Sequence, residues 1–180
     1  MSATSTSTTP LPTGSFTVEP ARSRVEFRAK HLGMAPVRGA FGAFEGTLAL
    51  SDDLAAARAY GSVSVASLDT GNERRDAHLR STAFFDVERF PTLTFESRRF
   101  RRLDDGTLEI AGDLTLRGTT RPIALTAALP PAEDGAPDDE RVALEVTGRL
   151  SRADYGMTSF TVLVSDTIDL RLDISAVKEA

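Results

Sequence analysis

Two histidines and three nearby acidic residues are the side chains of this chain best suited to acid–base or metal chemistry. They are His31 and His78, with Asp69, Glu73 and Asp76 shortly before His78. Imidazole and carboxylate groups together can bind a metal ion or move a proton. Their spacing follows no metal-ligand motif, and polar clusters without a motif rarely prove to be sites. We therefore predict no metal site and no catalytic residue, and structural roles for both histidines.

The chain lacks the residues and motifs that other common kinds of catalysis require. The chain has no cysteine, which excludes disulfides, thiolate nucleophiles and cysteine-bound zinc or iron–sulfur clusters. No G-x-S-x-G nucleophile motif is present, and neither is a phosphate-binding P-loop or a dinucleotide fingerprint. We expect a protein that is not an enzyme and needs no cofactor. A lipid-processing enzyme that uses the region of His78 stays open as an alternative.

Basic side chains near the histidines suggest a second kind of site. A basic rim that contacts a phosphate head group could be formed by Arg38, Arg74, Arg75 and Arg80, with His78 as a further polar residue of the rim. The alternative is that they make surface ion pairs with acidic neighbours such as Glu73 and Asp76, because mixed charge on a helix usually marks a solvated face.

The elements that must position these side chains are β-strands, because apolar residues recur with period two. Strands are predicted near 15–19, 23–31, 37–50, 58–67, 91–102, 107–117, 120–129 and 141–151, with another at 161–176. Each has one apolar and one polar face, as in antiparallel sheets that meet water on one side. Closure into a barrel buries the apolar faces together and removes exposed edges. We predict an all-β fold, a closed antiparallel β-barrel of about eight strands.

Residues 69–90 break this pattern. Thr70 and Glu73 have the spacing of a capping box, which predicts a short helix over 72–80. The helix is short and charged, so the phenylalanines that follow it must dock it, across one end of the barrel. Residues 1–14 are rich in Ser, Thr and Pro and are predicted to be a disordered tail, followed by a single barrel domain over 15–177.

A barrel of this size is either filled by side chains or holds one small ligand. Small residues such as Gly39, Gly46 and Gly61 on predicted strands would leave volume unfilled. Alternatively, these glycines provide the bends and bulges that closure needs. The predicted apolar lining, whose residue types would equally suit a packed core, is Val25, Phe27, Phe41, Phe44, Val63, Phe84, Phe85, Phe95, Leu114, Leu125, Phe160, Ile168 and Leu170.

Charge and hydropathy limit the partners and the location. The net charge is −5, which argues against nucleic-acid binding. The chain has no run of about 18 apolar residues, so no transmembrane helix is predicted. Residues 1–14 do not have the pattern of a secretory signal, so we expect a cytoplasmic protein. A transmembrane barrel would need outward apolar faces and aromatic girdles, and the chain has no tryptophan.

Four long segments of the sequence are distinctive, namely SLDTGNERRDAHLR at 67–80, FFDVE at 84–88, GDLTLRGTTRP at 112–122 and SRADYGM at 151–157. With these segments, the chain resembles the YceI-like family of bacterial polyisoprenoid-binding proteins over about residues 15–176. The resemblance implies a lipocalin-like barrel, often dimeric, that holds a long-chain isoprenoid or fatty-acid-like lipid. We therefore expect sequestration, storage or transport of a polyisoprenoid or isoprenoid quinone. A stress or interaction protein with a filled barrel stays open.

Overall fold

The structure is a computed structural model, described here for residues 10–31, 35–129, 140–159 and 164–180. One α-helix, α1 (Glu73–Arg80), and four short 3-10 helices, η1 (Pro20–Arg22), η2 (Leu54–Ala56), η3 (Val65–Ser67) and η4 (Arg152–Tyr155), accompany the strands. The strands are β1 (Gly14–Val18), β2 (Arg24–His31), β3 (Val37–Phe41), β4 (Phe44–Leu50), β5 (Arg58–Ser64), β6 (Leu68–Asp69), β7 (Thr92–Arg102), β8 (Leu108–Leu116), β9 (Thr119–Ala128), β10 (Arg141–Ser151) and β11 (Val164–Lys178).

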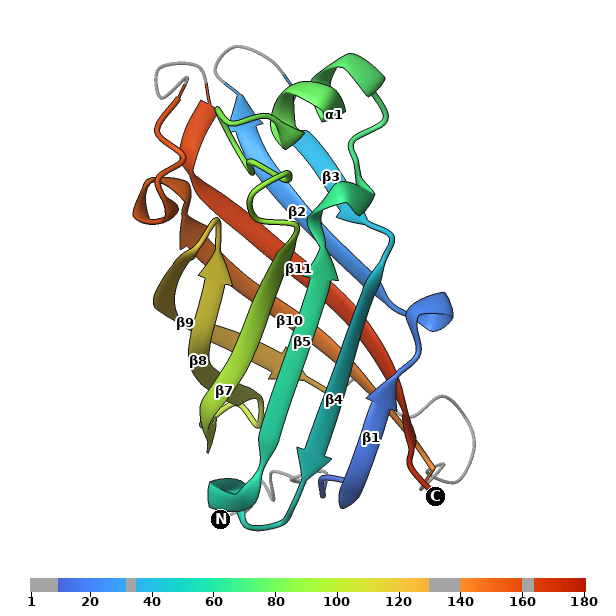
Figure 1. The fold of residues 1–180 in the computed structure, drawn as a ribbon. Coiled ribbons are helices and arrows are strands. Elements are labelled where there is room, and N and C mark those ends of the chain that lie inside the picture. Colours follow the sequence, from blue (N-terminus) through green and yellow to red (C-terminus); the bar gives the residue numbers. More distant parts are fainter. Residues whose placement is uncertain (1–9, 32–34, 130–139, 160–163) are drawn as a thin grey trace.

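The strands close into a barrel in which every pairing is antiparallel (Figure 1). The hydrogen-bonded order is β1-β4-β5-β7-β8-β9-β10-β11, and β1 pairs with β11 to complete a ring of eight strands. Further along β11, β2 replaces β1 as its partner, and β3 and β6 follow. The predicted all-β closed barrel with a short helix is confirmed.

The predicted strand 37–50 is two strands in the structure. β3 ends at Phe41 and β4 begins at Phe44, so the chain bends at Gly42 and Ala43. A glycine at a sharp bend is typical of a barrel corner. A second interruption, η1, separates β1 from β2. Each bend lets one long strand serve both ends of the barrel.

The first residues that pack into the barrel lie within the segment predicted to be a disordered tail. Leu11 is buried in the core and β1 begins at Gly14. The apolar Leu11 side chain lies within the Ser/Thr/Pro-rich stretch, and its burial contributes about 1.5–3 kcal/mol. The predicted disordered segment 1–14 is therefore too long at its carboxyl end, and residues 1–9 lie outside the described part.

The half of the barrel where β1 begins and β11 ends is filled by side chains. Phe16 and Ala127 are fully buried there, and Leu108 is 1% exposed. They belong to a cluster that also contains Leu11, Val18, Leu48, Leu50, Ala57, Phe100, Ile110, Leu125, Val142, Leu144, Val146 and Ala176. This half is a packed core that stabilises the closed barrel.

Helix α1 lies at the opposite end (Figure 1). Its N-cap is Asn72, whose side chain accepts a hydrogen bond from the Arg75 backbone N–H at 3.0 Å. The predicted capping box is wrong, because Thr70 instead donates its backbone N–H and hydroxyl to the buried carboxylate of Asp76. Arg80 donates to the Leu68 carbonyl, which ties the helix to β6. No helix among the described residues is long and apolar enough to cross a membrane.

Candidate ligand-binding cavity

The half of the barrel under α1 contains a cavity of about 360 Å³. Along a single strand, the inward-facing residues belong to the packed core at one end and line the cavity at the other. On β8, Leu108 and Ile110 belong to the packed core, whereas Leu114 and Leu116 line the cavity. The other long strands change in the same direction, so the packed core forms the floor of the cavity.

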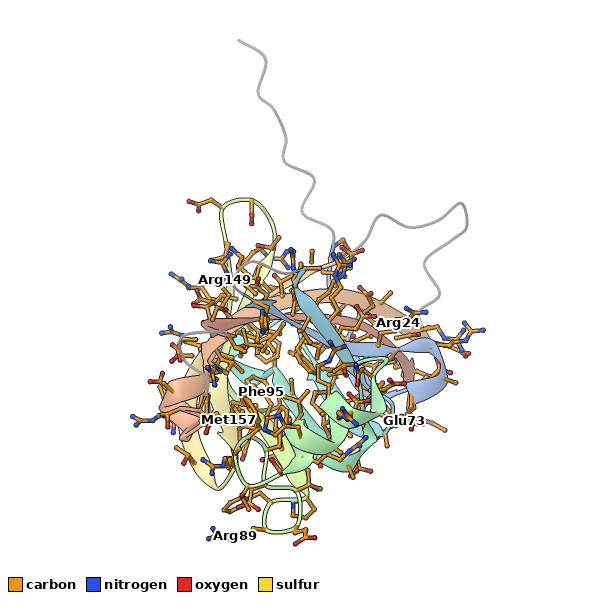
Figure 2. All side chains as sticks on the ribbon, turned by 90° about the horizontal axis from the view of Figure 1, so that it is seen from above. Arg24, Glu73, Arg89, Phe95, Arg149 and Met157 are labelled. Atoms are coloured by element: carbon orange, nitrogen blue, oxygen red, sulfur yellow. The ribbon has the colours of Figure 1, made fainter. Side chains whose placement is uncertain are left out.

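Most of the predicted lining residues face this cavity. Those that do are Val25, Phe27, Phe41, Val63, Phe84, Phe85, Phe95, Leu114, Leu125, Ile168 and Leu170. Phe44 does not line it and packs at the junction between the filled core and the cluster around Phe41. Phe160 lies outside the described residues. Seen from the α1 end, Phe95 and Met157 lie within the ring of strands, whereas Arg149 points outward (Figure 2).

Sequence reasoning missed about as many lining residues as it found. On the strands they are Glu26, Ala29, His31, Val37, Gly61, Leu93, Leu116, Ile123, Leu150, Val164 and Leu172, and elsewhere Leu79, Arg152 and Met157. Period-two alternation could have identified most of the strand residues, because they share a face with the predicted ones. Arg152 and Met157 carry no such signal, since they lie in and after η4.

Aromatic rings form one wall of the cavity. The Phe27 and Phe41 ring centroids are 5.5 Å apart, and Phe41 meets Phe85 edge to face at 6.0 Å. Such contacts add about 0.5–1.5 kcal/mol beyond the area that each pair buries. They hold the wall in place without contributions from polar groups.

The inward glycines have two different roles. A Cβ on Gly39 would collide with the Phe27 ring, and one on Gly112 would meet the Phe95 ring at 2.7 Å. These glycines leave room for rings rather than for a ligand. Gly61 differs, because it lines the cavity and a Cβ there would meet only the Glu45 carbonyl oxygen, at 3.8 Å. Of the space that the small residues were predicted to leave unfilled, only part is therefore cavity.

The predicted basic rim is only partly at the cavity. His78 lines it and its ring meets Phe84 edge to face at 5.2 Å. Arg75 also lines it, but its guanidinium donates to the hydroxyl and carbonyl oxygens of Thr70. Arg38 and Arg74 are exposed and do not line the cavity.

Arg152 is a buried cation in the cavity wall, at 3% exposure. Its guanidinium donates to the carbonyl oxygens of Met157, Ser159, Val164 and Ser165 at 2.7–3.1 Å. Burial lowers the pKa of this guanidinium, and the charge of Asp166 opposes that shift. The side chain thus connects η4 to the start of β11 and places a positive charge beside the cavity.

Two polar residues of the wall lie on β2, and one of them, Glu26, forms an ion pair with Arg24 at 3.5 Å. The other, His31, ends β2 on the same face as Val25, Phe27 and Ala29, and it pairs with Val164 of β11. Its Nδ1 is buried and has no hydrogen-bond partner in the described part of the protein.

The described residues contain no group of three or more His, Cys, Asp or Glu side chains that could hold a metal ion. The polar residues that line the cavity are Glu26, His31, Arg75, His78 and Arg152, and the other lining residues are apolar.

Comparison with known proteins agrees with this architecture. The model of the YceI-like domain matches residues 16–176. A UPF0312 protein of Enterobacter sp. (strain 638) is 33% identical over 156 residues, covering 86% of this chain and 81% of the relative. The crystal structure of BcnA from Burkholderia cenocepacia superposes with a TM-score of 0.80 at 21% identity, covering 89% of this chain and 99% of BcnA. A polyisoprenoid binding domain from Saccharophagus degradans has a TM-score of 0.68 at 13% identity, covering 91% and 98%. The chain belongs to the YceI-like domain family.

Proposed function

We propose that this protein binds the apolar chain of a single lipid molecule, such as an isoprenoid, inside the α1 half of the barrel. The observation that carries the proposal is the cavity itself, whose walls are mostly Phe, Leu, Ile and Val side chains. Transfer of a lipid chain from water into such walls is favourable by about 0.8 kcal/mol per methylene. The structural relative described as a polyisoprenoid binding domain supports an isoprenoid as the guest.

The filled half of the barrel limits how much of the guest can be inside. A cavity of about 360 Å³ holds roughly a dozen methylene-sized groups, taking each to be about as large as a water molecule, ~30 Å³. The floor, to which Phe95 and Leu125 contribute, prevents deeper entry. A longer polyisoprenoid would thus keep part of its chain outside the cavity.

The cavity also bears on the two alternatives. A filled barrel that acts only through its surface would not need an apolar hollow, which protein interiors normally avoid. A lipid-processing enzyme would need a nucleophile or an acid–base pair at the lipid. Among the described lining residues there is no Ser, Thr, Tyr or Cys, and the one carboxylate, Glu26, forms an ion pair with Arg24 at 3.5 Å. Binding is therefore the function that the cavity supports best.

Native mass spectrometry after mild extraction, followed by titration with lipids, tests the proposal. We expect one lipid per chain in the extracted protein, or saturable one-to-one binding of a fluorescent fatty acid that farnesol displaces. Protein that is repeatedly isolated without lipid and ignores fatty acids, farnesol and longer isoprenoids would contradict it.

A further inference from the structure

We propose that the guest carries a polar, oxygen-bearing end group and that His31 is the residue that hydrogen-bonds it. The inference rests on the proposed function and adds the chemical class of the ligand and its orientation. A pure hydrocarbon would fit the walls equally well, so the distinction depends on the polar atoms of the cavity.

The register of β2 and β11 places His31 in a corner of the cavity that also contains Arg152. His31 continues the inward face of β2, and its partner across the strands is Val164. Arg152 donates to the carbonyl oxygen of that same Val164 at 3.1 Å. The imidazole and the buried guanidinium therefore lie on neighbouring parts of one mostly apolar wall.

The unpaired Nδ1 of His31 is the feature that a ligand would explain. A buried polar atom without a partner costs about 1–3 kcal/mol, and native structures contain few of them. Within the described residues only Arg117 Nε shares this condition, and Arg117 does not line the cavity. A polar atom unpaired at a binding cavity is satisfied when the ligand supplies the partner.

The surroundings indicate an oxygen. A neutral imidazole nitrogen either accepts from a hydroxyl or donates to a carbonyl or carboxylate oxygen. Arg152 already donates to four carbonyl oxygens, so its contribution is its charge, which favours an electronegative group nearby. Alcohols, carboxylic acids and quinones share this chemistry, and a hydrocarbon does not.

The test compares decan-1-ol with decane in wild type and in His31→Leu. Each ligand is delivered from cyclodextrin, and its affinity is measured by displacement of a fluorescent fatty acid. Because one hydrogen bond contributes about 0.5–1.5 kcal/mol, we expect H31L to weaken decan-1-ol roughly three- to ten-fold more than decane. His31→Gln, which keeps a donor and an acceptor, should retain part of the preference. Val25→Ala, a control on the same strand face, should weaken both ligands equally.

A spectroscopic readout compares the two ligands in the wild-type protein itself. The chain has two histidines, so the imidazole ¹⁵N signals of the wild type can be assigned with H31Q. We expect the Nδ1 signal of His31 to shift with decan-1-ol and to stay in place with decane. Equal responses to both ligands, or equal weakening of both by H31L, would overturn the role of His31. Failure of both ligands to bind would instead refute the proposed function.

Discussion

Replacing Gly61 by leucine should convert the cavity into core. Gly61 lies on β5 opposite Phe95 of β7 and faces the cavity, and the nearest atom to an added Cβ is a backbone oxygen at 3.8 Å. The new side chain would fill about 120 Å³, since it adds four carbon-sized groups of ~30 Å³ each. It would therefore occupy more than a quarter of a cavity of about 360 Å³.

The expected change in stability follows from three contributions. Removing a glycine from a strand interior gains roughly 0.5–1 kcal/mol, and burying a leucine gains about 1.5–3 kcal/mol. Fixing the side chain opposes this by about 0.5–1 kcal/mol. The sum is a stabilisation of about 2 kcal/mol in the absence of ligand, which raises Tm by about 4–8 °C for a chain of this size.

Ligand binding should change in the opposite direction. A guest that loses contact for four methylene-sized groups loses about 3 kcal/mol, a roughly hundred-fold weaker affinity. Thermal unfolding of the unliganded variant and displacement of a fluorescent fatty acid measure the two effects on one sample.

Gly112→Leu is the matched control, because Gly112 is also an inward strand glycine but is covered by the Phe95 ring. It should lower stability by about 1–3 kcal/mol through overpacking. If G61L lowers stability as G112L does, or binds lipid as tightly as wild type, the position is not open to a ligand cavity and the reasoning is refuted.

Three further perturbations test the supports of the cavity. Arg152→Leu should destabilise the protein by about 3 kcal/mol or more in urea unfolding, because buried carbonyls lose their hydrogen-bond donor. The control Arg149→Leu loses only an exposed ion pair with Asp169 and should change stability by less than about 1 kcal/mol. Hydrogen bonds from Ser151 and Ala153 hold the pKa of Asp166 below its usual 3.8. They therefore stabilise the fold above pH 4, and this contribution is lost as the pH falls further. In urea unfolding between pH 7 and pH 2.5, the stability difference between wild type and Asp166→Asn should shrink below pH 4, and a difference that stays constant would contradict this role of Asp166. Asp76→Ala should cost about 1–3 kcal/mol by leaving the Thr70 N–H unpaired, and should weaken lipid binding because α1 forms part of the cavity wall.

The sequence predicted the barrel well because its strands are amphipathic with period two. Residues such as Leu114 and Leu170 could be assigned to the interior from alternation alone. The alternation does not say whether an inward residue lies in the packed half or the hollow half. That depends on the register of all eight strands around the ring, which no single strand encodes.

Other features of the site depend on contacts between segments far apart in the chain. Gly39 and Gly61 look alike in sequence, yet only Gly39 is covered by a ring, that of Phe27. Arg152 lies in a short 3-10 helix and becomes part of the wall because β11 supplies carbonyl acceptors. The N-cap at Asn72 rather than Thr70 follows from the engagement of Thr70 by Asp76.

A crystal structure with 12-bromododecanoic acid bound would test the lipid-binding cavity most directly. The bromine marks the end of the chain by its anomalous scattering, and the chain length matches a cavity that holds roughly a dozen methylene-sized groups. We predict a single bromine peak inside the barrel, in contact with Phe95 and Leu125 at the floor, with the carboxylate near His31. An absence of bromine inside the barrel, with the protein's own side chains filling the space under α1, would contradict the proposal.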